Sequence, residues 1–192
     1  RPRGSPMSEP VKIAFSPLGP AEGGALVVFA GAELALGSKA AALFQGAKGY
    51  LADAASTLGF KAKALSAMDL VRPAAVAAER LLVVGATAKP DDKPTDFASL
   101  GGFVAGKLAK AKRIQVMFEA PQGEWDAAAA ADFALGFRLR GYKFDKYKSK
   151  KPDADDADDV AQELTLLVAE PEAARRAFAA REGLAEGVEL AR

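Results

Sequence analysis

The segment Arg80-Leu81-Leu82-Val83-Val84-Gly85 decides the fold, because it is a short, continuous apolar run closed by a glycine. A run of this length without polar alternation predicts a strand covered on both faces, as in parallel sheets packed between helices. The run ALVVFA at 25–30, closed by Gly31, has the same character. These two segments predict the buried central strands of an α/β domain.

Weaker patterns on either side extend the sheet and supply the helices. Further strands are expected at 11–15, 113–118 and 163–169, with a poorer candidate at 61–71. Ser38 as N-cap and Gly59 as terminator bound a predicted helix, although Gly46 and Gly49 weaken the expectation of one unbroken element. Other helices are predicted at 124–139, from Pro171 onward, and after Thr95 or Asp96 with one apolar face (Phe97, Leu100, Phe103, Val104, Leu108). The alternation predicts a three-layer αβα domain with a mixed, mostly parallel sheet.

The length of 192 residues suits one domain with a full core and a tail. Residues 1–6, RPRGSP, precede Met7 and resemble the remnant of a cleavable tag. We expect the folded domain at 7–170. The remaining residues, 171–192, carry many charges and few large apolar side chains, so they are expected to form an exposed connecting helix toward a further domain.

The composition excludes several classes of function. The sequence has no cysteine and no histidine, which rules out disulfide frameworks, zinc–thiolate sites and Ser-His-Asp catalysis. No apolar run is long enough to span a membrane, and no secretory signal begins the chain. We therefore expect a cytoplasmic protein without membrane contact. Catalysis would have to use carboxylates, lysines, hydroxyls or a cofactor, and because the paired carboxylates have no apolar surroundings that would raise a pKa, we expect no catalytic residue and no metal ligand in this chain.

Charge is distributed unevenly along a nearly neutral chain. Residues 101–151 hold 11 basic and 5 acidic residues, and residues 152–172 hold 8 acidic and no basic residues. Within Tyr142–Lys151 aromatic residues alternate with lysines, a pattern that can bind nucleic acid through phosphate neutralisation and base stacking. The candidate polyanion contacts are Lys143, Lys146, Lys148, Lys150 and Lys151. Alternatively, Tyr142 and Phe144 complete helix packing while the lysines extend into water.

Glycines at 101–107 raise the question of a phosphate site. The segment matches GxxxxGK, but Leu108 stands where a phosphate loop needs Ser or Thr, and the pattern before it is helical. Small residues that let a helix approach the sheet explain these glycines better. The stretch Leu100–Gly106 also resembles the glycine-rich segment of ADP-ribose-binding macro domains.

The end of the predicted helix carries a more specific resemblance. The segment 134–151, ALGFRLRGYKFDKYKSKK, resembles the signature that ends the N-terminal domain of leucyl (cytosol) aminopeptidases. The order of strands and helices from Met7 to Arg192 is similar as well. The matching positions are Gly136, Leu139, Tyr142, Phe144, Asp145, Tyr147, Lys148, Ser149 and Lys150.

This resemblance implies a macro-like fold and a two-domain, hexameric metallo-exopeptidase that releases N-terminal amino acids from peptides. The family's catalytic domain holds two divalent ions, manganese or zinc, and its signature, similar to NTDAEGRL, is absent here. The resemblance therefore implies a non-catalytic N-terminal domain that supports assembly, has its own catalytic domain as partner, and is inactive alone without any cofactor. Two alternatives stay open: a stand-alone module for ADP-ribose or another nucleotide, and DNA binding, which some bacterial members show.

Overall fold

The computed structural model describes residues 11–20, 23–74, 76–87, 93–148 and 161–190, except for the side chains of 142–148 and 184–190. The strands are β1 (Lys12–Pro17), β2 (Ala25–Ala30), β3 (Ala67–Val71), β4 (Arg80–Gly85), β5 (Arg113–Met117) and β6 (Glu163–Val168). The helices are α1 (Ser38–Leu43), α2 (Lys48–Leu58), α3 (Phe97–Lys107), α4 (Ala127–Lys148) and α5 (Pro171–Leu190), with a 3-10 turn at Ala32–Leu34.

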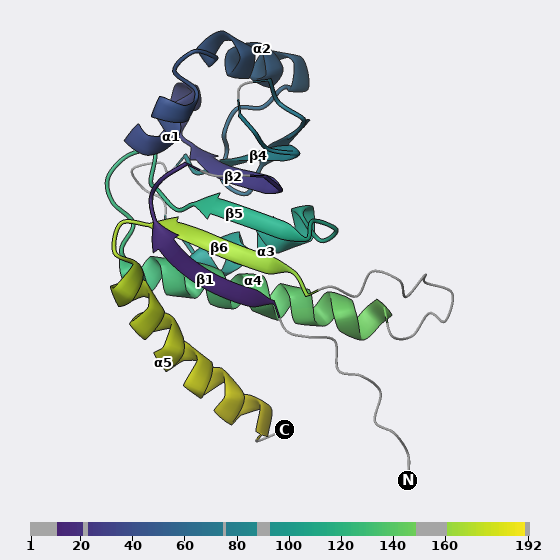
Figure 1. Ribbon diagram of the computed structural model, residues 1–192, viewed down its shortest axis with the longest axis vertical. Helices are drawn as coiled ribbons and strands as arrows, with labels where there is room; N and C mark the ends of the chain where they lie inside the picture. Colours follow the sequence, from purple (N-terminus) through teal and green to yellow (C-terminus); the bar gives the residue numbers. More distant parts are fainter. Residues whose placement is uncertain (1–10, 21–22, 75, 88–92, 149–160, 191–192) are drawn as a thin grey trace.

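The described strands form one six-stranded sheet in the order β1-β6-β5-β2-β4-β3 (Figure 1). Neighbouring strands run parallel, except that β3 runs antiparallel to β4 at one edge. The predicted mixed, mostly parallel sheet is confirmed. The two segments that decided the fold, β2 and β4, lie side by side near its middle.

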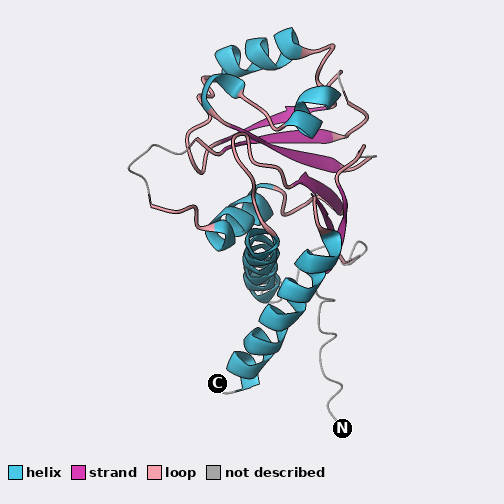
Figure 2. Ribbon diagram, turned by 90° about the vertical axis from the view of Figure 1, so that its left-hand side faces the viewer, coloured by secondary structure: helices cyan, strands magenta, loops and turns pink. Residues whose placement is uncertain are grey.

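Helices cover both faces of the sheet (Figure 2). β2 shows why its run is apolar throughout: Val27 and Phe29 pack in the core beneath α3, α4 and α5, whereas Leu26 and Val28 pack beneath α1 and α2. A strand buried on both faces needs apolar side chains at every position, so the period-two alternation disappears. The three-layer αβα architecture is therefore confirmed.

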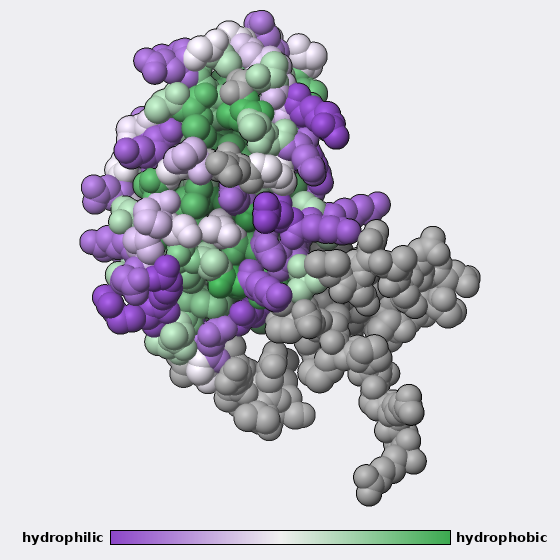
Figure 3. All heavy atoms as spheres, in the orientation of Figure 1, coloured by the Kyte–Doolittle hydropathy of each residue, from purple (hydrophilic) through white to green (hydrophobic). Residues whose placement is uncertain are grey.

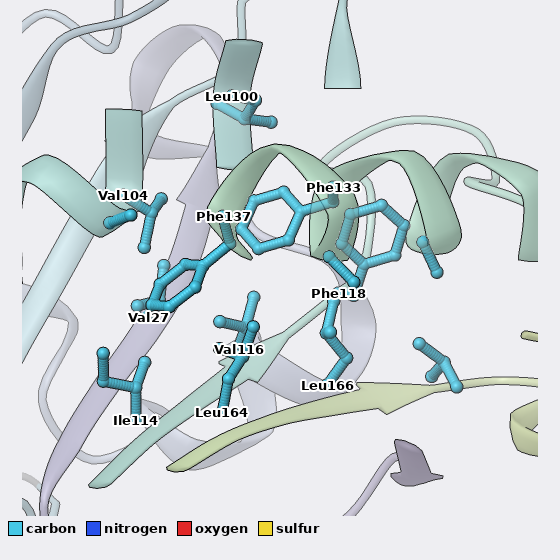
Figure 4. Packing of buried hydrophobic residues seen from close by; sticks show 14 of the residues in the cluster. Val27, Leu100, Val104, Ile114, Val116, Phe118, Phe133, Phe137, Leu164 and Leu166 are labelled. Atoms are coloured by element: carbon cyan, nitrogen blue, oxygen red, sulfur yellow. The ribbon is translucent and has the colours of Figure 1, made fainter. Parts of the chain in front are cut away.

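The larger core joins α3 and α4 to the central strands. Phe133 and Phe137 of α4 are fully buried and point toward strand residues that include Val116 and Leu164 (Figure 4). Burying a side chain of this size stabilises a fold by about 1.5–3 kcal/mol. These two rings hold α4 against the sheet along its first three turns.

The expected helix at 38–58 is broken, and its expected N-cap is wrong. α1 ends at Leu43, the chain turns through Gly46, and α2 begins at Lys48. Gly37, not Ser38, is the N-cap of α1, and it offers no side-chain bond. Gly59 does end α2 as predicted, in the left-handed conformation with φ of 68°.

Two other helices differ from expectation. α4 runs to Lys148 instead of Leu139, and Asp126 begins it by accepting a bond from the Ala129 amide at 2.8 Å. α5 begins at Pro171 as predicted, but one face of its first half is buried, with Ala174 and Phe178 packed in the core. Asp96 caps α3 as predicted. No helix in the described ranges is long and apolar enough to cross a membrane.

Candidate functional site: a cleft at the carboxyl edge of the sheet

A cleft of about 570 Å³ opens where the parallel strands end. Its walls come from the segments that follow β1, β2, β5 and β6, and these ends gather beside the starts of α4 and α5 (Figure 1). After β2 the chain leads to β4 on one side of β2, and later it crosses to β5 on the other side of β2. Ligands of open α/β sheets bind at such a switch point, so this cleft is the first candidate site.

Glu119, two residues after β5, closes part of this cleft with its own carboxylate. Oε1 accepts bonds from the Lys39 amide at 3.0 Å and the Ser38 hydroxyl at 3.1 Å, and Oε2 accepts one from the Ala40 amide at 3.1 Å. The side chain thus caps α1 from about 80 positions away in sequence. The Lys39 and Ala40 amides at the start of α1 are therefore already satisfied, and they need no bound anion.

The charges around the cleft disfavour phosphate. The charged residues in the described part of its lining are all acidic: Glu119, Glu124, Asp126 and Glu170. Trp125 forms the aromatic wall and contacts Phe29 and Phe118, with ring centroids 4.8 and 5.0 Å apart. Among the described residues of the cleft, a nucleotide pyrophosphate would meet four carboxylates and no guanidinium or ammonium group, so this lining does not suit ADP-ribose.

Within the described ranges, no group of three acidic or other metal-ligating side chains could hold an ion. Glu119 uses both carboxylate oxygens as a helix cap, and Asp126 uses one to begin α4. The carboxylate of Glu119 and one oxygen of Asp126 are therefore already engaged by main-chain amides. The two divalent ions that the family resemblance implies do not fit the residues of this cleft.

The glycine-rich segment lies elsewhere and has a packing role. Leu100–Gly106 belongs to α3, and its glycines lie against α4 and not against the sheet, so the expected reason for these glycines is wrong. The segment is also helical, unlike the ligand-binding loop that it resembles in sequence. A Cβ added to Gly101 would lie 2.0 Å from the carbonyl oxygen of Phe133. A helix–helix contact this close tolerates no side chain, so packing alone explains the glycine and no phosphate-binding role is needed to explain it.

The residues of the aminopeptidase-like signature all fall on α4 or just beyond it. Gly136 faces α3 at backbone distance, and Leu139 is 46% exposed. The other positions lie on the described backbone of α4, but their side chains are outside the described part of the chain, as are Ser149, Lys150 and Lys151 entirely. The structure therefore assigns a packing contact to Gly136 and leaves the lysines as a prediction. The lysines concerned within the helix are Lys143, Lys146 and Lys148.

A basic surface at the opposite, amino edge was missed by the sequence reasoning. α3 and α4 both end there, because each leads from the end of one parallel strand to the start of the next. Lys110, Lys112 and Arg113 line a hollow of about 480 Å³ together with Arg80 and one acidic residue, Glu79. Asp69 bonds Arg80 at 2.5 Å and raises the pKa of its guanidinium. The excess of basic residues at 101–151 was the available signal. Figure 3 shows hydrophilic residues along much of the outline of the molecule, on the right-hand side as well as on the left.

Comparison with known proteins identifies the family. The model of the cytosol aminopeptidase family N-terminal domain matches residues 25–151. The probable cytosol aminopeptidase of Methylobacterium radiotolerans is 45% identical over 193 residues, which cover 97% of this chain and 38% of that protein. That of a Bradyrhizobium strain is 41% identical over 187 residues, covering 97% of this chain and 37% of that protein. The chain thus spans well under half the length of these curated relatives.

Solved structures agree on the fold. A mutant of tomato leucine aminopeptidase is similar over the whole of this chain and 39% of its own, with a TM-score of 0.71 and 21% identity. A mutant macrodomain from Oceanobacillus iheyensis covers 91% of this chain and 92% of its own, with a TM-score of 0.57 and 11% identity. These neighbours confirm the macro-like α/β fold, and with the sequence matches they confirm the expected relationship. The chain belongs to the cytosol aminopeptidase family and corresponds to its N-terminal domain.

Proposed function

We propose that this chain serves as the non-catalytic N-terminal domain of a metal-dependent aminopeptidase that releases N-terminal residues from peptides in the cytoplasm. The observation that carries the proposal is the match to relatives named probable cytosol aminopeptidases, which covers 97% of this chain but 37–38% of each relative. We place the catalytic residues and the two divalent ions, manganese or zinc, in the part of the relatives beyond this match. The chain alone is then inactive and needs no cofactor.

In this proposal residues 7–170 form the supporting domain, and 171–192 lead toward the catalytic domain. The contacts of α5 support that role. Arg181 pairs with Asp132 of α4 at 2.6 Å, and Arg138 of α4 pairs with Glu182 while its guanidinium stacks on the Phe178 ring. Two ion pairs and a buried ring fix the direction in which α5 leaves the sheet. A domain attached after α5 would inherit that direction.

A domain exchange tests the proposal. The purified chain, assayed with leucine p-nitroanilide and either Mn²⁺ or Zn²⁺, should show no turnover. A chimera in which this chain replaces the matched 38% of the Methylobacterium radiotolerans protein should recover turnover and assemble to the same mass as that protein. Turnover by the chain alone, or a chimera that folds but neither assembles nor reacts, contradicts the proposal.

A second candidate function, DNA binding, is favoured by the basic amino edge. Lys110, Lys112 and Arg113 lie where α3 and α4 end, so the part of α4 that carries Lys143, Lys146 and Lys148 continues from the same side of the domain, whereas Lys150 and Lys151 lie outside the described residues. Binding to phosphates should weaken steeply between 50 and 200 mM salt. Fluorescence anisotropy with a labelled duplex would compare the wild type with the variant in which all five lysines at 143–151 are glutamine. Unchanged binding by that variant contradicts their role.

A further inference from the structure

The two edges of the sheet are protected very differently. At β1, Pro17 lacks an amide hydrogen, and the Arg175 guanidinium donates to the outward carbonyl of Phe15 at 2.8 Å. Arg138 reaches the carbonyl of Val11 at 3.5 Å, and α5 packs alongside the strand. Proline, covering helices and charged caps are the usual devices that prevent a sheet edge from pairing with another chain. β1 therefore has a closed edge.

β3, at the other edge, has no such protection from any of the described residues. The Arg72 amide donates to the carbonyl of Glu79, and the Gly85 amide donates to the carbonyl of Ser66, both at 2.8 Å. These two bonds determine which residues of β3 direct their main-chain groups toward β4. In an antiparallel pair every second residue bonds inward, so the amide and carbonyl groups of Ala67, Asp69 and Val71 point away from β4. Their orientation leaves three donors and three acceptors along the outer edge.

Apolar side chains surround this open edge. Five large apolar residues in the described ranges are exposed, and three of them lie on β3 or before it in the chain: Val71 at 73%, Leu58 at 56% and Leu65 at 52%. A groove of about 530 Å³ runs beside the strand, with Phe60 and Met68 among its lining residues. An open edge beside exposed apolar side chains is the arrangement that accepts an added strand.

The charges around the groove indicate which kind of protein segment would bind there. Lys61 and Lys63 line the groove, and Arg72 follows the strand; within the described part of the chain none of the three has a carboxylate partner. The acid that lines it, Asp69, is held by Arg80. Two copies paired edge to edge would bring these cations together. An extended segment with acidic residues on either side of apolar ones would instead be complementary.

We propose that β3 is a docking edge for an extended, acidic protein segment from a partner, which adds as a seventh strand. Main-chain bonds to Ala67, Asp69 and Val71 hold the segment, its apolar side chains contact Leu58 and Val71, and its carboxylates meet Lys61 and Lys63. This surface lies at the opposite end of the sheet from β1 and α5. The proposal does not depend on peptidase activity.

Hydrogen exchange of the free protein tests whether the edge is open. The amides of Asp69 and Val71 should exchange rapidly, whereas those of Met68 and Leu70, which bond to β4, should be protected. Protection of Asp69 and Val71 at every protein concentration would mean that the edge is covered within the chain. Protection that rises with concentration would mean that a second copy occupies it. Either result overturns the proposal.

Binding is tested with two fluorescent peptides that share the core Val-Thr-Val-Thr-Val, one flanked by Asp-Glu and Glu-Asp, the other by lysines. The acidic peptide should bind at least about tenfold more tightly in anisotropy titrations. The Lys61→Glu/Lys63→Glu variant should reverse this preference, while Lys39→Glu/Lys110→Glu, with the same charge change elsewhere, should not. Equal binding of both peptides, or no binding, overturns the proposal.

A second pair of variants separates main-chain pairing from side-chain contact. Val71→Pro removes one outward donor without touching the bonds to β4 and should weaken the acidic peptide about tenfold. Val71→Thr keeps the amide and the branched shape and should bind within about threefold of the wild type. Thermal unfolding confirms that both variants fold. If the two variants bind alike, the peptide does not add as a strand.

Discussion

Gly136 and Ala98 touch through their backbones. A Cβ built on Gly136 would lie 1.9 Å from the carbonyl oxygen of Ala98 and 2.7 Å from its Cα. Gly101 makes the reciprocal approach to Phe133, so α3 and α4 meet at two glycines. No L-residue with a side chain fits either position without moving a helix.

Gly136→Ala should therefore destabilise the domain strongly, by about 3 kcal/mol or more, because a methyl group at this point must separate two packed helices. Urea unfolding followed by circular dichroism measures the change. The matched control is Gly49→Ala in α2, where a Cβ would meet nothing within 4 Å. That variant should be neutral or up to about 1 kcal/mol more stable. Similar effects of both substitutions would contradict the packing role of Gly136.

Glu119→Ala should cost about 1–2 kcal/mol, because it leaves the amides of Lys39 and Ala40 without their acceptor and frees α1 from the end of β5. Hydrogen exchange of those two amides should rise in parallel with the loss in urea midpoint. Glu124→Ala, in the same cleft, is the control and should change stability by less than about 0.5 kcal/mol. Unaltered exchange at Lys39 and Ala40 would argue against the cap.

Asp96 should make stability depend on pH in the acid range. Bonds from the Ser99 amide at 3.0 Å and hydroxyl at 2.7 Å lower the pKa of Asp96 below its ordinary value of 3.8. A carboxylate whose pKa is depressed in the folded state stabilises above the unfolded pKa, and that contribution is lost as pH falls through the folded pKa. Asp96→Ala should thus be less stable than the wild type at pH 7.

The difference between the two proteins should shrink as pH falls below 3.8. Urea midpoints measured for both proteins from neutral pH into that range provide the test. Curves that stay parallel throughout would show that the carboxylate does not cap α3 in its charged form.

Phe178→Ala should cost about 3 kcal/mol and loosen α5, because the ring is 6% exposed and packs on Phe15 with centroids 5.8 Å apart. Hydrogen exchange should rise along α5 more than along α3. Arg176→Ala, on the exposed side of the same helix, is the control and should have little effect. An equal, uniform loss of protection in all helices would mean that α5 is not a separately held element.

ADP-ribose should release no measurable heat in calorimetry with this chain, since the cleft at the carboxyl edge presents Glu119, Glu124, Asp126 and Glu170 to a pyrophosphate. A macrodomain known to bind the ligand serves as the positive control. Micromolar binding would restore the interpretation as a stand-alone nucleotide module.

Local patterns in the sequence predicted the layers well. Continuous apolar runs identified β2 and β4, and cap residues correctly located the ends of α2 and α3 at Gly59 and Asp96. These features depend on neighbours in sequence, which is why they can be read without coordinates.

Features that depend on distant residues were not predictable in the same way. Ser38 has the right chemistry for an N-cap, yet a carboxylate from Glu119 performs that role, and no local pattern connects the two. α4 continues past Leu139 although its pattern weakens there. To predict the basic surface at the amino edge, one would have to know that α3 and α4 end at the same side of the sheet.

The glycine contact between α3 and α4 has a consequence for how the domain can change over time. Where the two main chains are in contact, neither helix can shift without the other, so α3 and α4 must move together relative to the sheet. A substitution at position 101 or 136 is then tolerated only if both helices are displaced together. A relative that loses one of these glycines would have to repack the whole layer formed by α3 and α4.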